Sequence, residues 1–328
     1  MTVLVTGSSG HLGDALVRTL RGQKVPVRGV DIKASPTTDV VGSITDRDVV
    51  ASCFAGVEAV LHTATLHKPH VATHSRQEFV DTNISGTLNL LEEARAHGVR
   101  KFVFTSTTST FGRALVPPPG EPTGWITEDV VPIPKNIYGV TKLAAEKMCQ
   151  LFASKFGVPS LVLRTSRFFP EEDDSRDARS RFSDENLKAN EFLHRRADLE
   201  DVVSAHLCAL EKVEEIGFDT FIISATTPFT EEHLADLRSD AVTVLADLFP
   251  ALQPVYERLD WTMFDGFDRV YVNDKARRLL DWSPKHDFGS VLRRVGKGGS
   301  VLSDIHTAVG SKGYHDQVFK DGPFPVED

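Results

Sequence analysis

The stretch TVLVTGSSGHLG (residues 2–13) decides the fold of this chain. Residues 2–6 are rich in β-branched side chains and predict a short buried strand. Gly7, Gly10 and Gly13 follow at once, and a helical pattern of apolar residues then runs to about Gly22. Glycines at this spacing let the backbone approach a pyrophosphate, whose charge is favoured at a helix N-terminus. Strand, glycine turn and helix together predict a dinucleotide-binding site.

A second apolar run, residues 25–30, ends in Asp31, which lies 18 residues after Gly13. A carboxylate at this distance is placed to accept hydrogen bonds from the adenosine ribose hydroxyls. A 2′-phosphate would face the same carboxylate, so the sequence favours NAD over NADP. Arg28 and Lys33 would favour the 2′-phosphate of NADP, unless they are solvated surface charges.

Further apolar runs of strand length recur along the first half of the chain. They cover residues 40–44, 57–63, 101–105 and 159–166. Helical patterns cover about 75–97 and 138–156, whereas residues 113–136 carry six prolines and predict a loop. Strands that alternate with helices predict an α/β fold, a Rossmann-type doubly wound parallel sheet. Residues 1–166 are the expected NAD-binding domain, to which the chain returns at about 198–225. Residues 167–328 are expected to form mainly a smaller C-terminal substrate-binding lobe, with an irregular tail at 296–328.

In such sheets ligands bind beyond the carboxyl ends of the strands. One glycine and several polar residues of this chain fall at predicted strand ends. They are Gly7, Asp31, Thr63, Ser106, Thr107, Arg164 and Thr165. Their convergence on one edge of the sheet is expected from the strand positions alone.

The composition is that of an ordinary globular enzyme. The 328 residues are 41% hydrophobic and 25% charged, with a net charge of −9. This balance does not suggest nucleic acid or an anionic membrane as a partner. Neither a signal sequence nor an apolar run long enough to span a membrane is evident, and the three cysteines are far apart. A cytoplasmic protein with reduced thiols is therefore expected.

Tyr138 and Lys142 lie four residues apart at the start of the 138–156 helix and share one of its faces. Free tyrosine has a pKa of about 10 and is a poor base at neutral pH. A neighbouring ammonium favours the phenolate and would allow proton exchange with an alcohol or carbonyl. An isolated Tyr-x-x-x-Lys is more often a surface pair. The glycine turn and the residues at the strand ends are what favour a catalytic role for this one.

With these residues assembled, the chain resembles the extended short-chain dehydrogenase/reductases, and specifically the NAD-dependent epimerase/dehydratase family. The resemblance is strong over about residues 2–210 and looser over 211–295. The matching pieces are Thr6-Gly7-x-x-Gly10-x-Leu12-Gly13, Asp31, His62-x-Ala64, Asn83, the Ser/Thr run before Phe111-Gly112, Tyr138-x-x-x-Lys142, Arg164 before Phe169-Pro170, Asp201-Val202-Val203-x-Ala205 and Asp274-Lys275-Ala276 with Trp282 and Pro284.

The resemblance implies that Thr107, Tyr138 and Lys142 are catalytic. Thr107 would bond the substrate oxygen, Tyr138 would move its proton, and Lys142 would bond the nicotinamide ribose and lower the pKa of Tyr138. The implied cofactor-binding residues are Gly7, Ser9, Gly10, His11, Leu12, Gly13, Asp31, Ile32, Ser43, Ile44, Thr63, Ala64, Thr65, Asn83, Thr105, Ser106, Tyr138, Lys142, Arg164 and Ser166. Family members commonly form homodimers through the two long helices, here about 75–97 and 138–156.

Four departures bear on the substrate. Ser43 stands where many members carry an adenine-contacting Asp. Thr108-Ser109 replace the Asp-Glu of sugar dehydratases, which argues against dehydration. Arg167 replaces an Asn and suits an anionic group, unless it pairs with the acids at 171–174. A pyrophosphate-binding Arg before Asp274 is not clear, since Arg269 is close but displaced.

The residues expected to meet the substrate are His67, Thr108, Arg167 and Asn186. His67, His70 and His74 have metal-ligand spacing, but Pro69 interrupts it, so we expect no metal. Arg195 and Arg196 suit either an anionic substrate or ion pairs with Glu200 or Asp201.

Three hypotheses follow for the function. The first is an NAD-dependent enzyme that acts on a carbinol of a sugar or nucleotide-sugar, as an epimerase that transfers hydride transiently. The second is a simple NAD-dependent dehydrogenase or reductase of a small alcohol, ketone or sugar acid. The third, a non-catalytic NAD-sensing protein, is disfavoured because Thr107, Tyr138 and Lys142 are all present.

Overall fold

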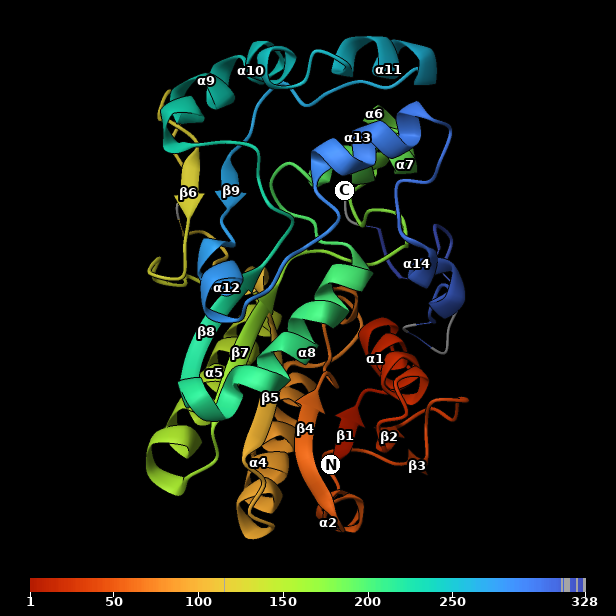
Figure 1. Cartoon of the computed structure of the whole chain (residues 1–328), viewed down its shortest axis with the longest axis vertical. Coiled ribbons are helices and arrows are strands. Elements are labelled where there is room, and N and C mark those ends of the chain that lie inside the picture. The colour runs from red at the N-terminus through yellow and green to blue at the C-terminus, as the bar shows by residue number, and fades with distance from the viewer. Residues whose placement is uncertain (115, 314, 316–318, 323, 327–328) are drawn as a thin grey trace.

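A seven-stranded parallel sheet forms the centre of the protein (Figure 1). The computed structural model describes residues 1–114, 116–313, 315, 319–322 and 324–326. The strands are β1 (Thr2–Thr6), β2 (Val27–Asp31), β3 (Val40–Val41), β4 (Val57–His62), β5 (Lys101–Thr107), β7 (Ser160–Thr165) and β8 (Phe218–Ile223). They lie in the order β3-β2-β1-β4-β5-β7-β8, and every pairing is parallel. This is the predicted doubly wound sheet, so the predicted fold class is confirmed.

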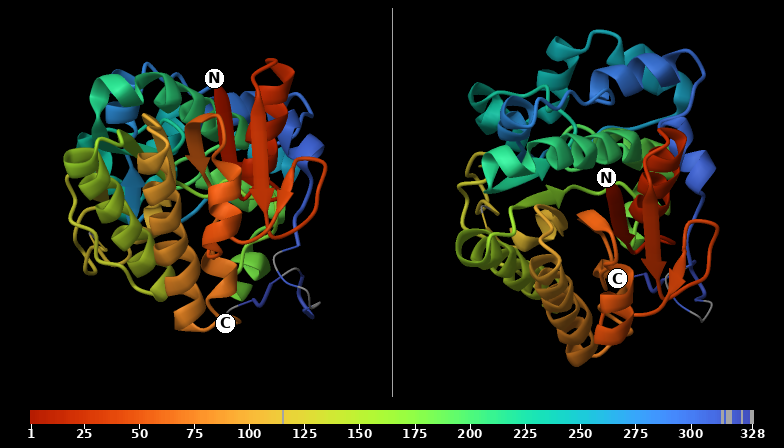
Figure 2. Two further views of the ribbon diagram at one scale, coloured as in Figure 1. Left: turned by 90° about the horizontal axis from the view of Figure 1, so that it is seen from below. Right: turned by 60° about the horizontal axis from the view of Figure 1, so that its bottom comes forward.

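Helices cover both faces of this sheet, which is why its strands are apolar runs rather than alternating patterns. One face carries α1 (His11–Gly22) and α8 (Leu199–Ile216). The other face carries α2 (Arg47–Cys53), α4 (Gly86–Ala96) and α5 (Ile137–Phe156), and Figure 2 shows α4 and α5 side by side. Each face has its own hydrophobic core, so the strand ends are held rigidly from both sides.

A second lobe lies beyond the carboxyl ends of the strands (Figure 1). Its two short strands, β6 (Gly124–Ile126) and β9 (Arg269–Tyr271), pair in parallel, and its helices share a separate core. Besides α8, the helices from the second half of the chain are α6 (Arg176–Arg181), α7 (Asp184–Glu191), α9 (Leu234–Ser239), α10 (Ala241–Leu248), α11 (Leu252–Leu259), α12 (Asp274–Leu279), α13 (Phe288–Gly296) and α14 (Asp304–Val309).

The predicted 75–97 helix is present but not uniform. It begins as α3 (Arg76–Val80), passes through a π-helical turn at Asp81–Ser85 and continues as α4. The hydroxyl of Ser75 accepts a hydrogen bond from the backbone N–H of Glu78 and caps its start. Turns of this kind are frequent at functional sites, and this one contains Asn83.

Three predictions about element boundaries were wrong. The proline-rich segment 113–136 contains β6, because its partner β9 comes from a distant part of the chain that local pattern cannot show. The 40–44 run supplies only the two residues of β3, since the chain turns away after Val41. The tail expected to be irregular contains α14, which packs against α1 and α8.

Candidate active site

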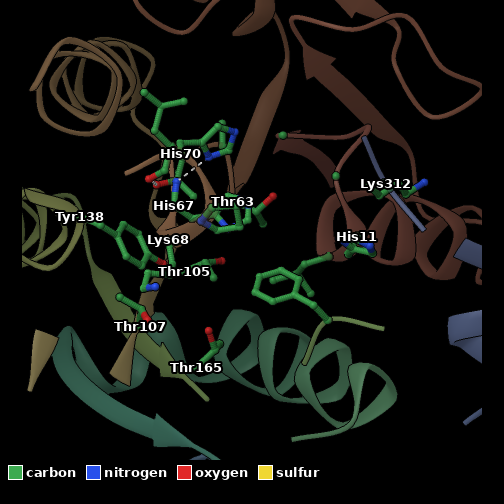
Figure 3. Close-up of a pocket in the computed structure, with 18 of the residues that line it drawn as sticks. His11, Thr63, His67, Lys68, His70, Thr105, Thr107, Tyr138, Thr165 and Lys312 are labelled. Atoms are coloured by element: carbon green, nitrogen blue, oxygen red, sulfur yellow. Dashed lines mark hydrogen bonds between the residues drawn. The ribbon is translucent and has the colours of Figure 1, made fainter. Parts of the chain in front are cut away.

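One continuous cavity of about 1270 Å³ runs along the carboxyl ends of the strands into the second lobe. Figure 3 shows Thr63, Thr105, Thr107, Tyr138 and Thr165 around it. It begins at the glycine turn and extends to Lys135, Arg269 and Tyr271. Pockets for one small ligand usually measure about 300–1,000 Å³. The volume therefore suits a dinucleotide together with a second molecule.

The glycine turn has the close packing that a pyrophosphate site requires. Gly7 has φ +70°, and a Cβ there would lie 2.7 Å from the nitrogen of Ala64. A Cβ on Gly13 would lie 2.0 Å from the oxygen of Gly7, so helix and strand approach too closely for any side chain. Gly10 is the N-cap of α1, which places the first backbone N–H groups of that helix at the cavity.

Asp31 ends β2 and lines the cavity beside the glycine turn. Its carboxylate accepts hydrogen bonds from the backbone N–H groups of Ser9 at 3.0 Å and Lys33 at 2.9 Å. These bonds fix the side chain and leave lone pairs for ribose hydroxyls. Arg28 instead donates to the carbonyls of Cys53 and Ala55 and does not line the cavity, which removes one argument for NADP.

The side chain of Ser166 offers an independent hydrogen-bonding group to a bound molecule. Its hydroxyl oxygen is buried, lines the cavity and has no hydrogen-bond partner among the residues that the structure describes. Buried hydroxyls are normally satisfied, so this one suits a polar group of a bound molecule. On the adenosine side, Ser43 and Ile44 also line the cavity, with the Ser43 hydroxyl 2.8 Å from that of Thr45.

Tyr138 and Thr107 meet at the wall of the cavity that the end of β5 and the start of α5 form (Figure 3). Burial raises the pKa of Tyr138 to about 12, and a hydrogen bond with the Thr107 side chain works in the opposite direction. The Thr107 hydroxyl also accepts a hydrogen bond of 3.1 Å from the backbone N–H of Ser109, which orients it. Together the two hydroxyls can bind one substrate oxygen and exchange a proton with it.

Lys142 shares the helix face of Tyr138 but does not line the cavity. Its ammonium nitrogen lies 4.0 Å from the centroid of the Phe104 ring. Burial lowers the pKa of Lys142 to about 7, although Glu146 and Cys149 act to raise it. The predicted contact with the nicotinamide ribose, and the predicted lowering of the Tyr138 pKa, therefore require this side chain to turn toward the cavity.

Arg164 was expected to bind the cofactor, but it does not line the cavity and contacts Glu146 instead. Its Nε and Nη2 donate to the two carboxylate oxygens of Glu146 at 3.0 and 2.7 Å. The Ser106 hydroxyl donates to Glu146 Oε1 at 2.5 Å. Glu146 thus joins β7 to β5 and α5, the two elements that carry Thr107 and Tyr138. The sequence carried a usable signal for it, since Glu146 follows Lys142 by one helical turn.

Asn83 also lies outside the cavity lining and acts on the loop that follows β4. Its side-chain oxygen accepts a hydrogen bond of 2.9 Å from the Leu66 backbone N–H, and its nitrogen donates to the Leu66 carbonyl at 2.9 Å. The same nitrogen donates to Thr141 on α5 at 3.0 Å. Asn83 therefore supports the site indirectly, by fastening the 65–66 loop to the helix of Tyr138.

The predicted substrate residues divide into two groups. His67, Thr108 and Arg167 line the cavity, and the His67 ring stacks on Phe169 with centroids 5.3 Å apart. Asn186 does not line the cavity, because its amide is buried in α7, where it donates to the Thr262 carbonyl at 2.9 Å.

Arg167 is held by acids of the second half of the chain. It pairs with Asp173, lies 3.6 Å from an oxygen of Asp174 and lies 3.4 Å from one of Glu191. Arg195 and Arg196 reach Glu191 at 2.9 and 2.8 Å. Arg167 therefore forms ion pairs with acids of the 171–174 run, which is the alternative stated for it. Arg195 and Arg196 also form ion pairs, but their partner is Glu191 rather than Glu200 or Asp201.

Two negative observations concern other site types. Within the residues that the structure describes, no group of three His, Cys, Asp or Glu side chains is arranged to hold a metal ion. No helix in this part of the chain combines the length and apolarity needed to cross a membrane.

Comparison with known proteins agrees with this geometry. The model of the NAD dependent epimerase/dehydratase family matches residues 3–223. The chain belongs to this family. NAD is accordingly its cofactor, and the glycine turn, Asp31 and Ser166 fit that molecule.

Relatives and solved structures of this family differ in what they do. A protein of Bacillus subtilis described as an uncharacterized UDP-glucose epimerase is 31% identical over 50% of this chain and 55% of its own length. The UDP-glucose 4-epimerase of Corynebacterium glutamicum is 23% identical over 95% of this chain and 100% of its own. The uronate dehydrogenase of Pseudomonas putida is 26% identical over 52% of this chain and 62% of its own. The chain thus spans about half to two thirds of the length of some relatives and the whole of others.

Two solved structures share the fold. A short-chain dehydrogenase/reductase superfamily protein of Agrobacterium tumefaciens with bound NAD has a TM-score of 0.64 and 24% identity, covering 90% of this chain and 96% of its own. A UDP-glucose 4-epimerase of Thermotoga maritima has a TM-score of 0.62 and 23% identity, covering 90% and 98%. The predicted fold, family and cofactor are confirmed.

Proposed function

We propose that this family member is an NAD-dependent epimerase that oxidises and re-reduces a carbinol of a sugar or nucleotide-sugar. The meeting of Tyr138 and Thr107 part-way along one long cavity carries the proposal. The glycine turn and Asp31 occupy one end of that cavity, and Lys135, Arg269 and Tyr271 lie at the other. Space on both sides of the catalytic hydroxyls suits a cofactor and a sugar-sized second molecule.

In the proposed reaction, hydride transfer belongs to the cofactor, and binding of the reacting oxygen and proton transfer belong to Thr107 and Tyr138. NAD, when bound, supplies the acceptor and later the donor of the hydride. Thr107 holds the reacting oxygen, and the Tyr138 oxygen takes the hydroxyl proton as the carbinol becomes a carbonyl. Return of the hydride to the other face of the carbonyl carbon, and of the proton from Tyr138 to its oxygen, gives the epimer, so electrons and protons balance over the cycle. Because burial raises the pKa of Tyr138 to about 12, a nearby positive charge is needed for the phenolate, and Lys142 is the side chain on the same helix face that can supply it.

The nucleotide-sugar part of the proposal draws on the relatives. The alignment with the Corynebacterium glutamicum UDP-glucose 4-epimerase covers nearly all of both chains. In addition, Lys135 and Arg269 bring positive charge to the far end of the cavity, where a diphosphate could bind. Arg269 holds the carbonyl of Gly112 through one nitrogen at 2.7 Å.

The test is a substrate panel of nucleotide-sugars, free sugars and sugar acids. Each is followed for NADH absorbance and for epimeric product by NMR. We expect epimer to accumulate without net NADH, and NAD to remain with the purified protein. Stoichiometric NADH with freely exchanging cofactor would instead establish a dehydrogenase.

The dehydrogenase alternative is favoured by one observation. The acids at 173 and 174 and Glu191 neutralise Arg167, which stands where nucleotide-sugar enzymes of the family often carry an Asn. Ion pairs in this place reduce the room and charge available to a diphosphate. The match to uronate dehydrogenase is consistent with a smaller substrate.

We also propose a homodimer through α4 and α5. Leu88, Val140 and Leu151 lie on these helices with side chains 39%, 50% and 47% exposed, respectively. Such apolar groups on adjacent helices suit a four-helix contact with a second copy. Sedimentation should give a dimer for the wild type and for Val131→Glu, a control in a loop, but a monomer for Val140→Glu. A monomeric wild type would contradict the proposal.

A further inference from the structure

The chain returns to the cofactor half after α14. We call Gly310–Gly313 the C-terminal strap. Ser311, Lys312 and Gly313 all line the cavity, on the side of the glycine turn and Asp31. Figure 3 shows Lys312 on a separate segment next to the start of α1, with His11 nearby. These residues follow a helix that packs on α1 and α8, so the strap is anchored at its N-terminal side.

Glu171, in the loop after β7, fastens the strap at its first point. One oxygen of this carboxylate accepts hydrogen bonds from the Ser311 hydroxyl at 2.8 Å and the Lys312 backbone N–H at 2.9 Å. The same oxygen lies 2.8 Å from Nε2 of His11, the first residue of α1. Burial acts to raise the pKa of Glu171, but these bonds and the charge of His11 outweigh it and lower the pKa to about 2. The carboxylate therefore remains an acceptor at every physiological pH.

Two further anchors hold the strap to the nucleotide-binding segments. The Lys312 ammonium lies 2.7 Å from Asp14, a buried residue in the first turn of α1 that also pairs with Arg18 at 2.6 Å. The Lys33 ammonium donates to the Gly313 carbonyl at 3.1 Å. The three anchors come from α1, the loop after β2 and the loop after β7. Two of them, Lys33 and Glu171, line the same cavity as the glycine turn, where a pyrophosphate would bind.

We propose that the C-terminal strap is a wall of the cofactor site that retains NAD, with Lys312 as its main fastening residue. A dinucleotide on the N-terminus of α1 would lie between this strap and the strand ends. Its release would then require the Lys312–Asp14 and Glu171 contacts to open. The proposal needs only cofactor binding, and it stands whether the enzyme is an epimerase or a dehydrogenase.

The test measures NADH release by stopped-flow fluorescence, with no substrate present. The net contribution of one hydrogen bond to a charged group corresponds to a factor of about 10 to 150. We therefore expect Lys312→Ala to release NADH at least about tenfold faster than wild type, and Lys312→Arg to restore slow release. Lys297→Ala is the matched control, because Lys297 is exposed and does not line the cavity. It should release NADH at the wild-type rate.

Association rates separate retention from simple charge attraction. An opened strap should leave the association rate of NADH unchanged or faster. A slower association with unchanged release would mean that Lys312 only attracts phosphates, and it would overturn the proposal, as would wild-type release from Lys312→Ala. A chain that ends at Val309 provides a second variant with faster release still. If that truncation does not fold, the comparison of Lys312→Ala with Lys297→Ala still decides the matter.

Discussion

The wall of the cavity at the ends of β4, β5 and β7 carries hydroxyl groups, whereas the wall formed by residues 167–196 carries ion pairs. Thr63, Thr107 and Ser166 belong to the first wall. Arg167, Asp173 and their partners belong to the second. Both walls are polar, but the side chains of the first keep hydrogen-bonding capacity for a ligand, whereas those of the second are paired with one another.

The difference between the two walls suggests different roles, one in the reaction and one in shaping the cavity. The hydroxyls of Thr63 and Thr107 bond the backbone through part of their capacity, that of Ser166 bonds no described residue, and all three keep a donor or lone pair for a ligand. The charged groups of 167–196 are bonded mainly to one another, because buried charges are costly unless paired. The strand-end wall should therefore govern chemistry, and the ion-paired wall should govern stability and the shape of the substrate space.

Replacing Tyr138 tests the strand-end wall and should have the largest effect. Tyr138→Phe removes the group that exchanges the proton and should lower turnover by about 10³- to 10⁴-fold, or about 4–5.5 kcal/mol. NADH affinity and thermal stability should change little, which fluorescence titration and calorimetry can check. Turnover within tenfold of wild type would assign the proton transfer to another residue.

Replacing Glu191 tests the ion-paired wall. Glu191→Ala would leave Arg196 buried without its carboxylate and should lower the free energy of unfolding by about 3–5 kcal/mol. Glu185→Ala is a control on the same helix, since Glu185 is exposed. Urea unfolding measures both. A loss below about 1 kcal/mol for Glu191→Ala would mean that the arginines find other partners.

The position of Lys142 predicts proton uptake when NAD binds. Its pKa of about 7 lies below its usual value because of burial, so the free protein holds it mostly neutral at pH 8. A bond to the cofactor ribose would raise that pKa, so binding should take up as much as about one proton at pH 8 and almost none below pH 6. The affinity for NAD should then fall by up to about tenfold per pH unit above 7.

Calorimetry in buffers of different ionisation enthalpy measures this uptake. Lys142→Met is the control and should bind NAD without it. The cofactor-free protein should also become more stable as pH rises from about 7 toward the ordinary lysine pKa of 10.5, since the unfolded chain binds the extra proton there. Equal proton uptake in the wild type and Lys142→Met would show that Lys142 does not engage the cofactor.

Lys68 should give the smallest effect on stability. Its ammonium lies 2.6 Å from Asp174, but the two side chains are 29% and 20% exposed, so solvent screens the pair. Lys68→Met should lower the free energy of unfolding by less than about 1 kcal/mol in urea titrations. A larger loss would mean that this contact between the 66–74 loop and the 170–175 loop is part of the fold.

The two walls also differ in how far the sequence predicts them. Gly7, Asp31, Thr107 and Tyr138 were found from the sequence, because strand ends and helix faces follow from local apolar periodicity. Arg167 was recognised as unusual, but its partner Glu191 was not, since that choice depends on how α7 packs against the loop after β7. Lys312 gave no signal, because a single lysine in a polar tail carries no pattern. Lys142 lay on the predicted helix face, yet its ammonium nitrogen lies 4.0 Å from the centroid of the Phe104 ring, outside the cavity lining.

We propose that Tyr138, in the strand-end wall, takes the hydroxyl proton of one carbinol and that bound NAD takes its hydride. The direct measurement uses a substrate identified in the panel and labelled with deuterium at its reacting carbon, in a single turnover with NAD-loaded enzyme. We expect mass spectrometry to find the deuterium on the nicotinamide ring or returned to the same carbon. Loss of the deuterium to solvent would contradict it, because that outcome requires removal of the carbon-bound hydrogen as a proton.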